Sequence, residues 1–321
     1  MPLNAIKIAV TGATGFVGSG LLARLAGVSH LTLMAWVRAI PGQPLQSVQY
    51  VQKSVLESDT KLQGSMASVD VVIHLAARVH VISDHSTDPL TEFRKVNVQS
   101  TLNLARQASA AGVRRFIFIS SIKVNGESTQ PGRSFTADDV PAPLDAYGIS
   151  KMEAEQGLRQ IADETGMEVV IIRPPLVYGP GVKANFAAMM RWLQRGVPLP
   201  FGAIHNQRSL VALDNLVDLI VLCLTHPSAA NQTFLVSDGE DVSTSELLRR
   251  TGQAMGLPAR LFPVPANLLK LAAALLGKSD VAQRLCGSLQ LDITKTRQLL
   301  GWTPSLSLSE GLKKAAEGRR V

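Results

Sequence analysis

A glycine-rich turn near the start of the chain constrains the fold most. The apolar segment Ile6 to Val10 has the pattern of a buried strand, and a helical run of leucines begins at Leu21. Between them, Gly12 and Gly15 would let the backbone turn tightly and approach a pyrophosphate, and Gly18 would let the helix pack closely on the strand. The three-residue spacing of Gly12, Gly15 and Gly18 differs from that of the G-x-G-x-x-G motif. This strand, turn and helix therefore predict a nucleotide site, with a purely structural turn as the alternative.

A tyrosine and a lysine four residues apart are the second informative feature. Tyr147 and Lys151 lie in a segment, Tyr147 to Ala162, that is predicted to be a helix, so both side chains project from one helical face. A lysine cation beside a phenol favours the phenolate. It therefore moves the tyrosine pKa down from about 10 towards the operating pH, where proton transfer is most useful. A surface pair without function is the alternative. Because the pair follows the glycine-rich turn and a strand ending in Ser120 and Ser121, we predict a proton-transfer site beside a nucleotide.

Strands and helices alternate through the first half of the chain. This rhythm is typical of a doubly wound parallel sheet, a Rossmann-type α/β fold. The predicted strands are residues 7–11, 31–37, 48–51, 71–75, 116–120 and 169–173. Their carboxyl ends should meet at one edge, where ligands bind in this fold.

The second half of the chain loses this rhythm. Proline-rich turns separate short helices, and a strand-like segment, residues 233–237, is expected to return to the main sheet. We expect a nucleotide-binding domain of residues 1–172, joined by residues 210–240, and a smaller, discontinuous substrate domain of residues 173–209 and 241–321. The apolar tract Leu268 to Leu276 is predicted to form a helix that caps the substrate domain, with contact to a membrane interface as the alternative.

Composition is that of an ordinary globular protein. With 321 residues, 46% of them hydrophobic, the chain can bury a large core. We see no signal segment and no apolar run that could span a bilayer, and Cys223 and Cys286 lack metal-ligand spacing, so we expect a cytoplasmic protein without a disulfide or a metal site. The net charge of +7 comes without a basic stripe or a nucleic-acid-reading module, which favours an anionic substrate and cofactor over nucleic acid.

Taken together, the motifs resemble those of a known family, the extended short-chain dehydrogenase/reductases, and within it the nucleotide-sugar epimerase/dehydratase group. Besides the two motifs above, the matching segments are residues 71–77, 97–103, 116–121, 173–180, 208–218 and 291–302. The resemblance covers nearly the whole chain. It implies an NAD(P)-dependent enzyme acting on a nucleotide-diphosphate sugar, and a homodimer formed through the helix of residues 91–108 and the helix that carries Tyr147.

The resemblance also implies roles for individual residues. The serine at the position of Ser121 binds the reacting sugar oxygen in this family, Tyr147 exchanges the proton, and Lys151 holds the nicotinamide ribose and tunes Tyr147. The cofactor is expected against Gly12, Thr14, Gly15, Phe16, Val17, Gly18, Arg38, Leu75, Ala76, Ala77, Asn97, Tyr147, Lys151 and Pro174.

The sugar diphosphate is expected to contact Asn185 and Arg208, because an asparagine and an arginine at these places hold it in relatives. Lys123 and Arg284 are further candidates for substrate binding. A solvated surface charge is the alternative for Arg208, Arg284 and Lys123.

The end of the second predicted strand bears on the choice of cofactor. An acidic residue usually holds the adenosine ribose hydroxyls there, whereas this chain has Arg38. Pairing of Arg38 with a 2′-phosphate favours NADP(H), and stacking of Arg38 on adenine leaves NAD(H) as the alternative. The acidic residue expected after the third strand is also replaced, by Lys53 and Ser54.

The residues after Ser121 reduce the number of reactions that this site could catalyse. Sugar dehydratases of this family have Asp and Glu there, and Ile122 and Lys123 supply no evident base for eliminating water. Segments 120–127 and 287–292 look most similar to bacterial reductases of UDP-linked 4-keto-6-deoxy-N-acetylhexosamines, which serve surface-polysaccharide synthesis. Reduction is therefore the first hypothesis. A UDP-hexose 4-epimerase with tightly bound NAD is the alternative, and a non-catalytic dinucleotide-binding regulator is the alternative of another class.

A few other residues have simpler interpretations. His74 falls in a buried-type strand and is predicted to be a hydrogen-bonded core residue, while His80 and His85 follow in a loop, with a substrate contact as the alternative to a structural role. Trp302 is predicted to pack the C-terminal region. Asn125 stands where relatives usually have a tyrosine, and the sequence assigns it no role.

Overall fold

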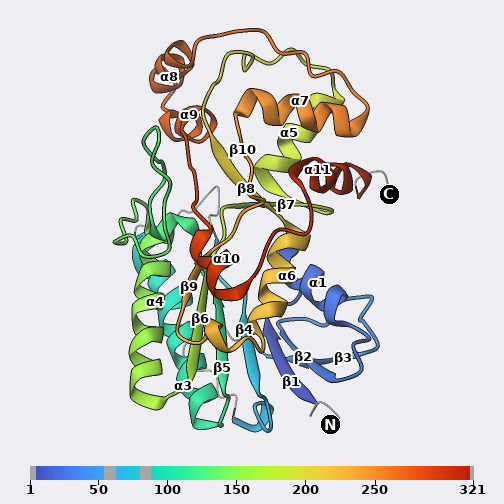
Figure 1. Ribbon diagram of the computed structural model, residues 1–321, viewed down its shortest axis with the longest axis vertical. Helices are drawn as coiled ribbons and strands as arrows, with labels where there is room; N and C mark the ends of the chain where they lie inside the picture. The colour runs from blue at the N-terminus through green and yellow to red at the C-terminus, as the bar shows by residue number, and fades with distance from the viewer. Residues whose placement is uncertain (1–4, 54–62, 80–87, 319–321) are drawn as a thin grey trace.

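A seven-stranded parallel sheet forms the lower part of the molecule (Figure 1). The computed structural model describes residues 5–53, 63–79 and 88–318. The strand order is β3-β2-β1-β4-β5-β6-β9, with strands β1 (Ile6–Thr11), β2 (Leu31–Val37), β3 (Val48–Gln52), β4 (Val71–His74), β5 (Arg115–Ile119), β6 (Glu168–Arg173) and β9 (Thr233–Leu235). The predicted doubly wound α/β sheet is confirmed, and the direction of winding reverses between β1 and β4. The predicted return of residues 233–237 is confirmed by the pairing of β9 with β6.

Helices cover both faces of this sheet, because successive side chains of its strands alternate between two apolar clusters. Ile8 and Val10 belong to the cluster that contains leucines of α1 (Phe16–Leu25) and α6 (Leu213–Cys223). Ala9 belongs to the cluster that contains residues of α3 (Ser100–Ala110) and α4 (Ala146–Thr165). Burial on both faces explains why the strands read as continuous apolar runs.

The predicted helix of residues 91–108 is interrupted. It consists of α2 (Pro89–Phe93), the π-helical segment η2 (Arg94–Gln99) and α3. Such a widened turn is uncommon and often accompanies a functional site. Here it carries Asn97, which is buried.

A smaller three-stranded sheet lies above the first one (Figure 1). Its order is β10-β8-β7, with strands β7 (Leu176–Tyr178), β8 (Arg208–Ala212) and β10 (Asp241–Val242). The core at this sheet includes residues of α5 (Ala184–Gln194), α7 (Thr244–Met255) and α11 (Leu308–Glu317). The remaining segments are α8 (Ala266–Leu275), α9 (Ser279–Cys286), α10 (Thr294–Leu300), η1 (Gln63–Ser65), η3 (Ile122–Val124) and η4 (Pro227–Ala229). Trp302 is buried in the core of the large sheet, which confirms its predicted packing role.

The apolar tract around residues 268–276 forms α8, the helix that the sequence predicts. None of its residues is buried, and Leu275 is 81% exposed. Its leucines at positions 268, 271 and 275 share an exposed face, while the helix packs against α9, so its role as a cap of the substrate domain stays a prediction. Among the described residues, no helix is long and apolar enough to cross a membrane.

Candidate active site

The glycine-rich turn after β1 has the shape that a dinucleotide requires. Gly12 has φ +65°, and a Cβ added to it would lie 2.7 Å from the backbone nitrogen of Ala76. A Cβ on Gly18 would lie 2.2 Å from the carbonyl oxygen of Gly12, so both positions exclude any side chain. Gly15 begins α1 without a side-chain cap, and the first turn of α1 holds no acidic residue. The amides at this helix end therefore suit a pyrophosphate, which makes the turn a good fit for a nicotinamide dinucleotide.

The loop after β4 lies beside this turn and is fixed by buried polar groups. Thr11 Oγ1 accepts a hydrogen bond from the Ala76 amide at 3.2 Å and pairs with His74 Nδ1 at 2.7 Å. His74 Nε2 pairs with Thr101 Oγ1 at 2.9 Å, and burial lowers the pKa of His74 to about 3. His74 is thus a neutral, hydrogen-bonded core residue, as predicted.

Asn97 holds the same loop from the other side. Its Nδ2 donates to the carbonyl of Arg78 and to Ser150 Oγ, both at 3.0 Å, and its Oδ1 accepts from the Arg78 amide at 2.8 Å. The side chain is therefore bonded to the protein through both of its polar atoms. It links the β4 loop to α4, and we expect it to shape the cofactor site through that loop.

The three predicted catalytic residues come from two neighbouring elements. Ser121 follows β5 and begins η3, where its Oγ accepts a hydrogen bond from the Lys123 amide at 3.2 Å. Its hydroxyl hydrogen remains able to donate to a ligand oxygen. Asp145 caps α4 by accepting from the Gly148 amide at 2.7 Å, and the first turns of α4 carry Tyr147 and Lys151.

Lys151 is buried beneath the carboxyl end of β5. Its Nζ donates to the carbonyl of Ile119 at 2.9 Å and lies 4.3 Å from the centre of the Phe118 ring. Burial lowers the pKa of Lys151 to about 7, and the nearby Glu155 carboxylate opposes this shift. Burial raises the pKa of Tyr147, and the negative charge of Asp145 adds to the rise. In the protein alone, Tyr147 is consequently a phenol at neutral pH.

Lys123, a predicted substrate contact, is held by carboxylates of the chain itself. Its ammonium donates to Glu127 Oε1 at 2.9 Å and forms a short contact with Asp145 Oδ2. Both partners are partly exposed. The Lys123 cation therefore compensates the negative charge of Asp145 at the start of α4. Its contact with a substrate stays a prediction.

The predicted diphosphate contacts lie in the upper part of the molecule. Arg208 begins β8 and donates from Nη1 to the carbonyl of Gly287 at 3.0 Å. Burial and the neighbouring charge of Arg284 on α9 lower the pKa of Arg208. The two arginine cations therefore lie close to each other. Asn185 lies exposed in the first turn of α5, and Arg38 is exposed just after β2. Ser54, His80 and His85 lie outside the described residues.

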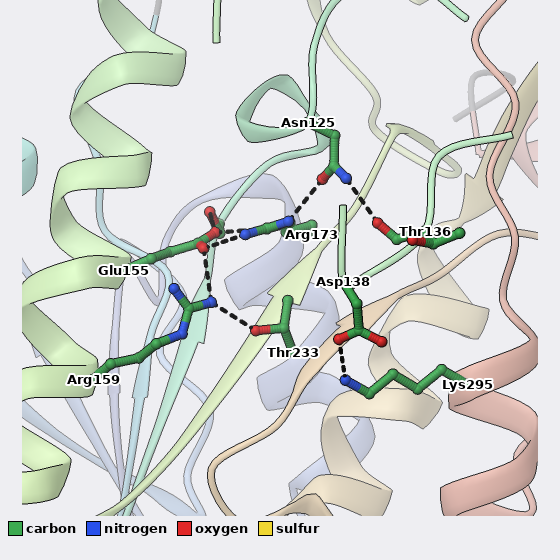
Figure 2. Close-up of polar contacts among 9 residues, drawn as sticks. Asn125, Thr136, Asp138, Glu155, Arg159, Arg173, Thr233 and Lys295 are labelled. Carbon is green, nitrogen blue, oxygen red and sulfur yellow. Dashed lines mark hydrogen bonds and ion pairs between the residues drawn. The ribbon is translucent and has the colours of Figure 1, made fainter. Parts of the chain in front are cut away.

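Sequence reasoning missed a buried ion pair at the carboxyl end of β6, which contacts Ser120, the chain neighbour of Ser121. Glu155 and Arg173 form this ion pair, joined by Ser120, Asn125 and Arg159 (Figure 2). The sequence feature that could have revealed Glu155 is its position four residues after Lys151, on the same helical face.

Comparison with known proteins places this geometry in a family. The model of the NAD dependent epimerase/dehydratase family matches residues 8–237, which include the glycine-rich turn, Ser121, Tyr147 and Lys151. The chain belongs to this family of NAD-dependent enzymes. The predicted family resemblance is therefore confirmed.

Two relatives and one solved structure show how far the similarity extends. A UDP-glucose 4-epimerase of Vibrio cholerae is 50% identical over 312 residues, covering 97% of this chain and 94% of the relative. A UDP-glucose 4-epimerase of Mycolicibacterium smegmatis is 30% identical over 332 residues, covering 97% and 98%. The structure of MoeE5 in complex with UDP-glucuronic acid and NAD superposes with a TM-score of 0.79 at 26% identity, covering 98% of this chain and 99% of that one.

Proposed function

We propose that this epimerase/dehydratase family member is a UDP-hexose 4-epimerase that works with a retained NAD cofactor. The main support is the 50% identity, over 97% of the chain, to a relative named UDP-glucose 4-epimerase. The reduction of a 4-keto sugar, our first hypothesis from the sequence, has less support than this alternative. Family membership and the NAD in the MoeE5 complex also favour NAD over the NADP(H) that Arg38 suggested.

The arrangement of Ser121, Tyr147 and Lys151 suits proton exchange at the sugar 4-hydroxyl. Tyr147 takes the proton from this hydroxyl and later returns it to the same oxygen, to which the Ser121 hydroxyl donates a hydrogen bond. A bound oxidised nicotinamide would supply a positive charge beside Tyr147 and a reversible acceptor for the hydride of the sugar 4-carbon. The Lys151 cation favours the phenolate of Tyr147, against the burial and the Asp145 charge that favour the phenol.

An epimerase must also hold its substrate while the sugar ring turns. Arg208 and Arg284 place two positive charges together, and Asn185 lies at the start of α5 in the same upper part of the molecule. Bidentate arginine contacts suit the oxygens of a diphosphate. Anchoring through the diphosphate would leave the sugar free to present either face to the cofactor.

Incubation of the purified protein with UDP-galactose, without added cofactor, tests the proposal. We expect UDP-glucose to appear until the two sugars reach equilibrium, and acid denaturation of the protein to release NAD. If the protein instead consumes NADPH in step with reduction of a UDP-linked 4-keto-6-deoxy-N-acetylhexosamine and leaves UDP-galactose unchanged, it is a reductase.

We also propose that the chain forms a homodimer through α3 and α4. These helices lie side by side on one face of the large sheet (Figure 1). A second pair from another copy would complete a four-helix bundle. Light scattering after gel filtration tests this, and a monomer mass at micromolar concentration would overturn it.

A further inference from the structure

A fully buried ion pair joins α4 to the carboxyl end of β6 (Figure 2). Glu155 is 0% exposed and Arg173 is 1% exposed. Arg173 donates from Nε to Glu155 Oε1 at 2.9 Å and from Nη2 to Glu155 Oε2 at 2.6 Å. This is the bidentate geometry in which arginine binds carboxylate most strongly. We call Glu155 and Arg173 the carboxyl-end pair, because they lie at the carboxyl end of β6.

The carboxyl-end pair joins the segments that carry the catalytic residues. Ser120, the neighbour of Ser121, donates from Oγ to Glu155 Oε1 at 2.6 Å. Arg173 donates from Nη1 to Asn125 Oδ1 at 2.9 Å, which fixes the turn that follows η3. Asn125, to which the sequence assigns no role, donates in turn to the carbonyl of Thr136 at 2.8 Å (Figure 2). The end of β5, the η3 turn, α4 and the end of β6 are thus tied together by two charged side chains.

Lys151 and Glu155 hold successive residues at the end of β5. Lys151 donates to the carbonyl of Ile119, and Glu155 accepts from the hydroxyl of Ser120. A change in either contact would move Ser121, which follows directly in the chain. The position of the Ser121 hydroxyl relative to Lys151 therefore depends on Glu155.

Glu155 is also the anion one helical turn away from Lys151. Of the other titratable groups nearby, His74 on β4 is neutral, Tyr147 lies one turn earlier on the same helix, and Arg173 on β6 is bonded to Glu155. The side of β5 contributes an aromatic ring and a carbonyl, which carry no net charge. Glu155 consequently stabilises the charged form of Lys151.

Stability alone does not account for such a pair. The desolvation of two buried charges largely offsets their attraction, and well-packed apolar residues of similar size are often as stable or more stable. What apolar residues cannot supply is the hydrogen bond to Ser120, the hydrogen bond to Asn125 and the negative charge beside Lys151.

We propose that Glu155 and Arg173 are positioning residues for the reaction. They fix Ser121 and Lys151 relative to each other and keep a negative charge one helical turn from the Lys151 ammonium. The inference rests on the proposed function in assigning the reaction to Ser121, Tyr147 and Lys151.

The chain offers a matched control at the opposite ends of the same two strands. Arg115 begins β5, is 1% exposed and donates from Nε to Glu168 Oε2 at 2.7 Å. Glu168 begins β6. We call Arg115 and Glu168 the amino-end pair; it lies far from the catalytic groups, at the other edge of the sheet.

The test compares Glu155→Gln with Glu168→Gln in kcat, in the pH profile of kcat/KM and in the pKa of Lys151. The last is followed by NMR of 13C-labelled lysine, with the Lys151 signal assigned by its loss in Lys151→Met. We expect Glu155→Gln to lower kcat by about 10- to 100-fold, the loss seen when groups that orient metal ligands are removed, and to lower the pKa of Lys151. Its activity should be lost first at the alkaline end, because the pKa of Lys151 falls below its present value of about 7. Glu168→Gln should leave all three quantities unchanged.

The double variant Glu155→Met with Arg173→Met removes both charges while keeping similar side-chain volumes, so it provides the test if a single variant fails to fold. We expect it to fold with kcat still reduced at least tenfold. A folded double variant with the wild-type kcat and pH profile, or a Lys151 pKa unchanged in Glu155→Gln, would overturn the proposal. If the wild type does not convert UDP-hexoses but the Lys151 pKa shifts as expected, only the proposed function fails.

Discussion

Arg115 and Arg173 are both buried, at opposite ends of neighbouring strands, and their surroundings differ. Arg115 at the amino end of β5 donates to the carbonyls of Cys223 and His226 at 2.6 and 3.0 Å, and its carboxylate partner Glu168 is 30% exposed. It fastens the end of α6 to the sheet. Arg173 at the carboxyl end of β6 instead donates to two side chains, those of Glu155 and Asn125.

The contrast follows from the fold rather than from the residues. Parallel strands bring their carboxyl ends to the edge where ligands bind, so a charge buried there lies next to the reacting groups. The charge of Arg115, buried at the amino end of β5, instead meets Glu168 and carbonyls at and just after the end of α6. Similar ion pairs therefore serve anchoring at one edge and, in our proposal, catalysis at the other.

The largest expected effect is at the carboxyl edge itself. Tyr147→Phe removes the hydroxyl that exchanges the proton and should lower kcat by about 10²- to 10⁴-fold. The fold and the bound NAD should be retained, which circular dichroism and the NAD content of the purified variant will show. Turnover at the wild-type rate would mean that another group exchanges the proton.

The second test compares the stability of Arg173→Met with that of Arg115→Met. Arg173→Met leaves Glu155 buried without its main partner, at a cost of about 3–5 kcal/mol. Arg115→Met should cost about 1–3 kcal/mol, because the lost donors leave two carbonyls unsatisfied while the partly exposed Glu168 can be hydrated. Urea unfolding measures both values. Equal losses would show that the two ends of the sheet do not differ in this respect.

The smallest effect is expected for the partly exposed ion pair at the start of α4. Lys123→Met should change the free energy of unfolding by no more than about 1 kcal/mol, because exposed pairs contribute little. It also leaves the charge of Asp145 uncompensated, which raises the pKa of Tyr147 further. Since Tyr147 acts as a base when deprotonated, the acidic limb of the pH profile of kcat/KM should move to higher pH. A shift to lower pH, or a large loss of stability, would contradict this account of Lys123.

Much of the lower part of the molecule could be predicted from the sequence, because its signals are local. The strands are apolar runs, Gly12 and Gly18 mark a turn where no side chain fits, and Tyr147 and Lys151 are one helical turn apart. These features need no knowledge of distant residues.

The rest depends on contacts between distant segments. Glu155 and Arg173 are 18 residues apart and meet only because α4 packs on β6. The contacts of Asn97 with the β4 loop depend on the π-helical turn that carries it, and its predicted contact with the cofactor stays a prediction. The choice between reduction and epimerisation was beyond the sequence motifs, because both reactions use the same Ser, Tyr and Lys.

Isotope tracing through the reaction tests the central claim most directly. UDP-galactose carrying deuterium at the sugar 4-carbon is incubated in ordinary water with the purified protein and no added cofactor, and the UDP-glucose formed is analysed by NMR and mass spectrometry. An epimerase with a retained cofactor returns the same hydrogen to the same carbon, so we predict that the deuterium stays at the 4-carbon. Loss of the deuterium, or the absence of UDP-glucose, would contradict the proposed chemistry at Ser121, Tyr147 and Lys151.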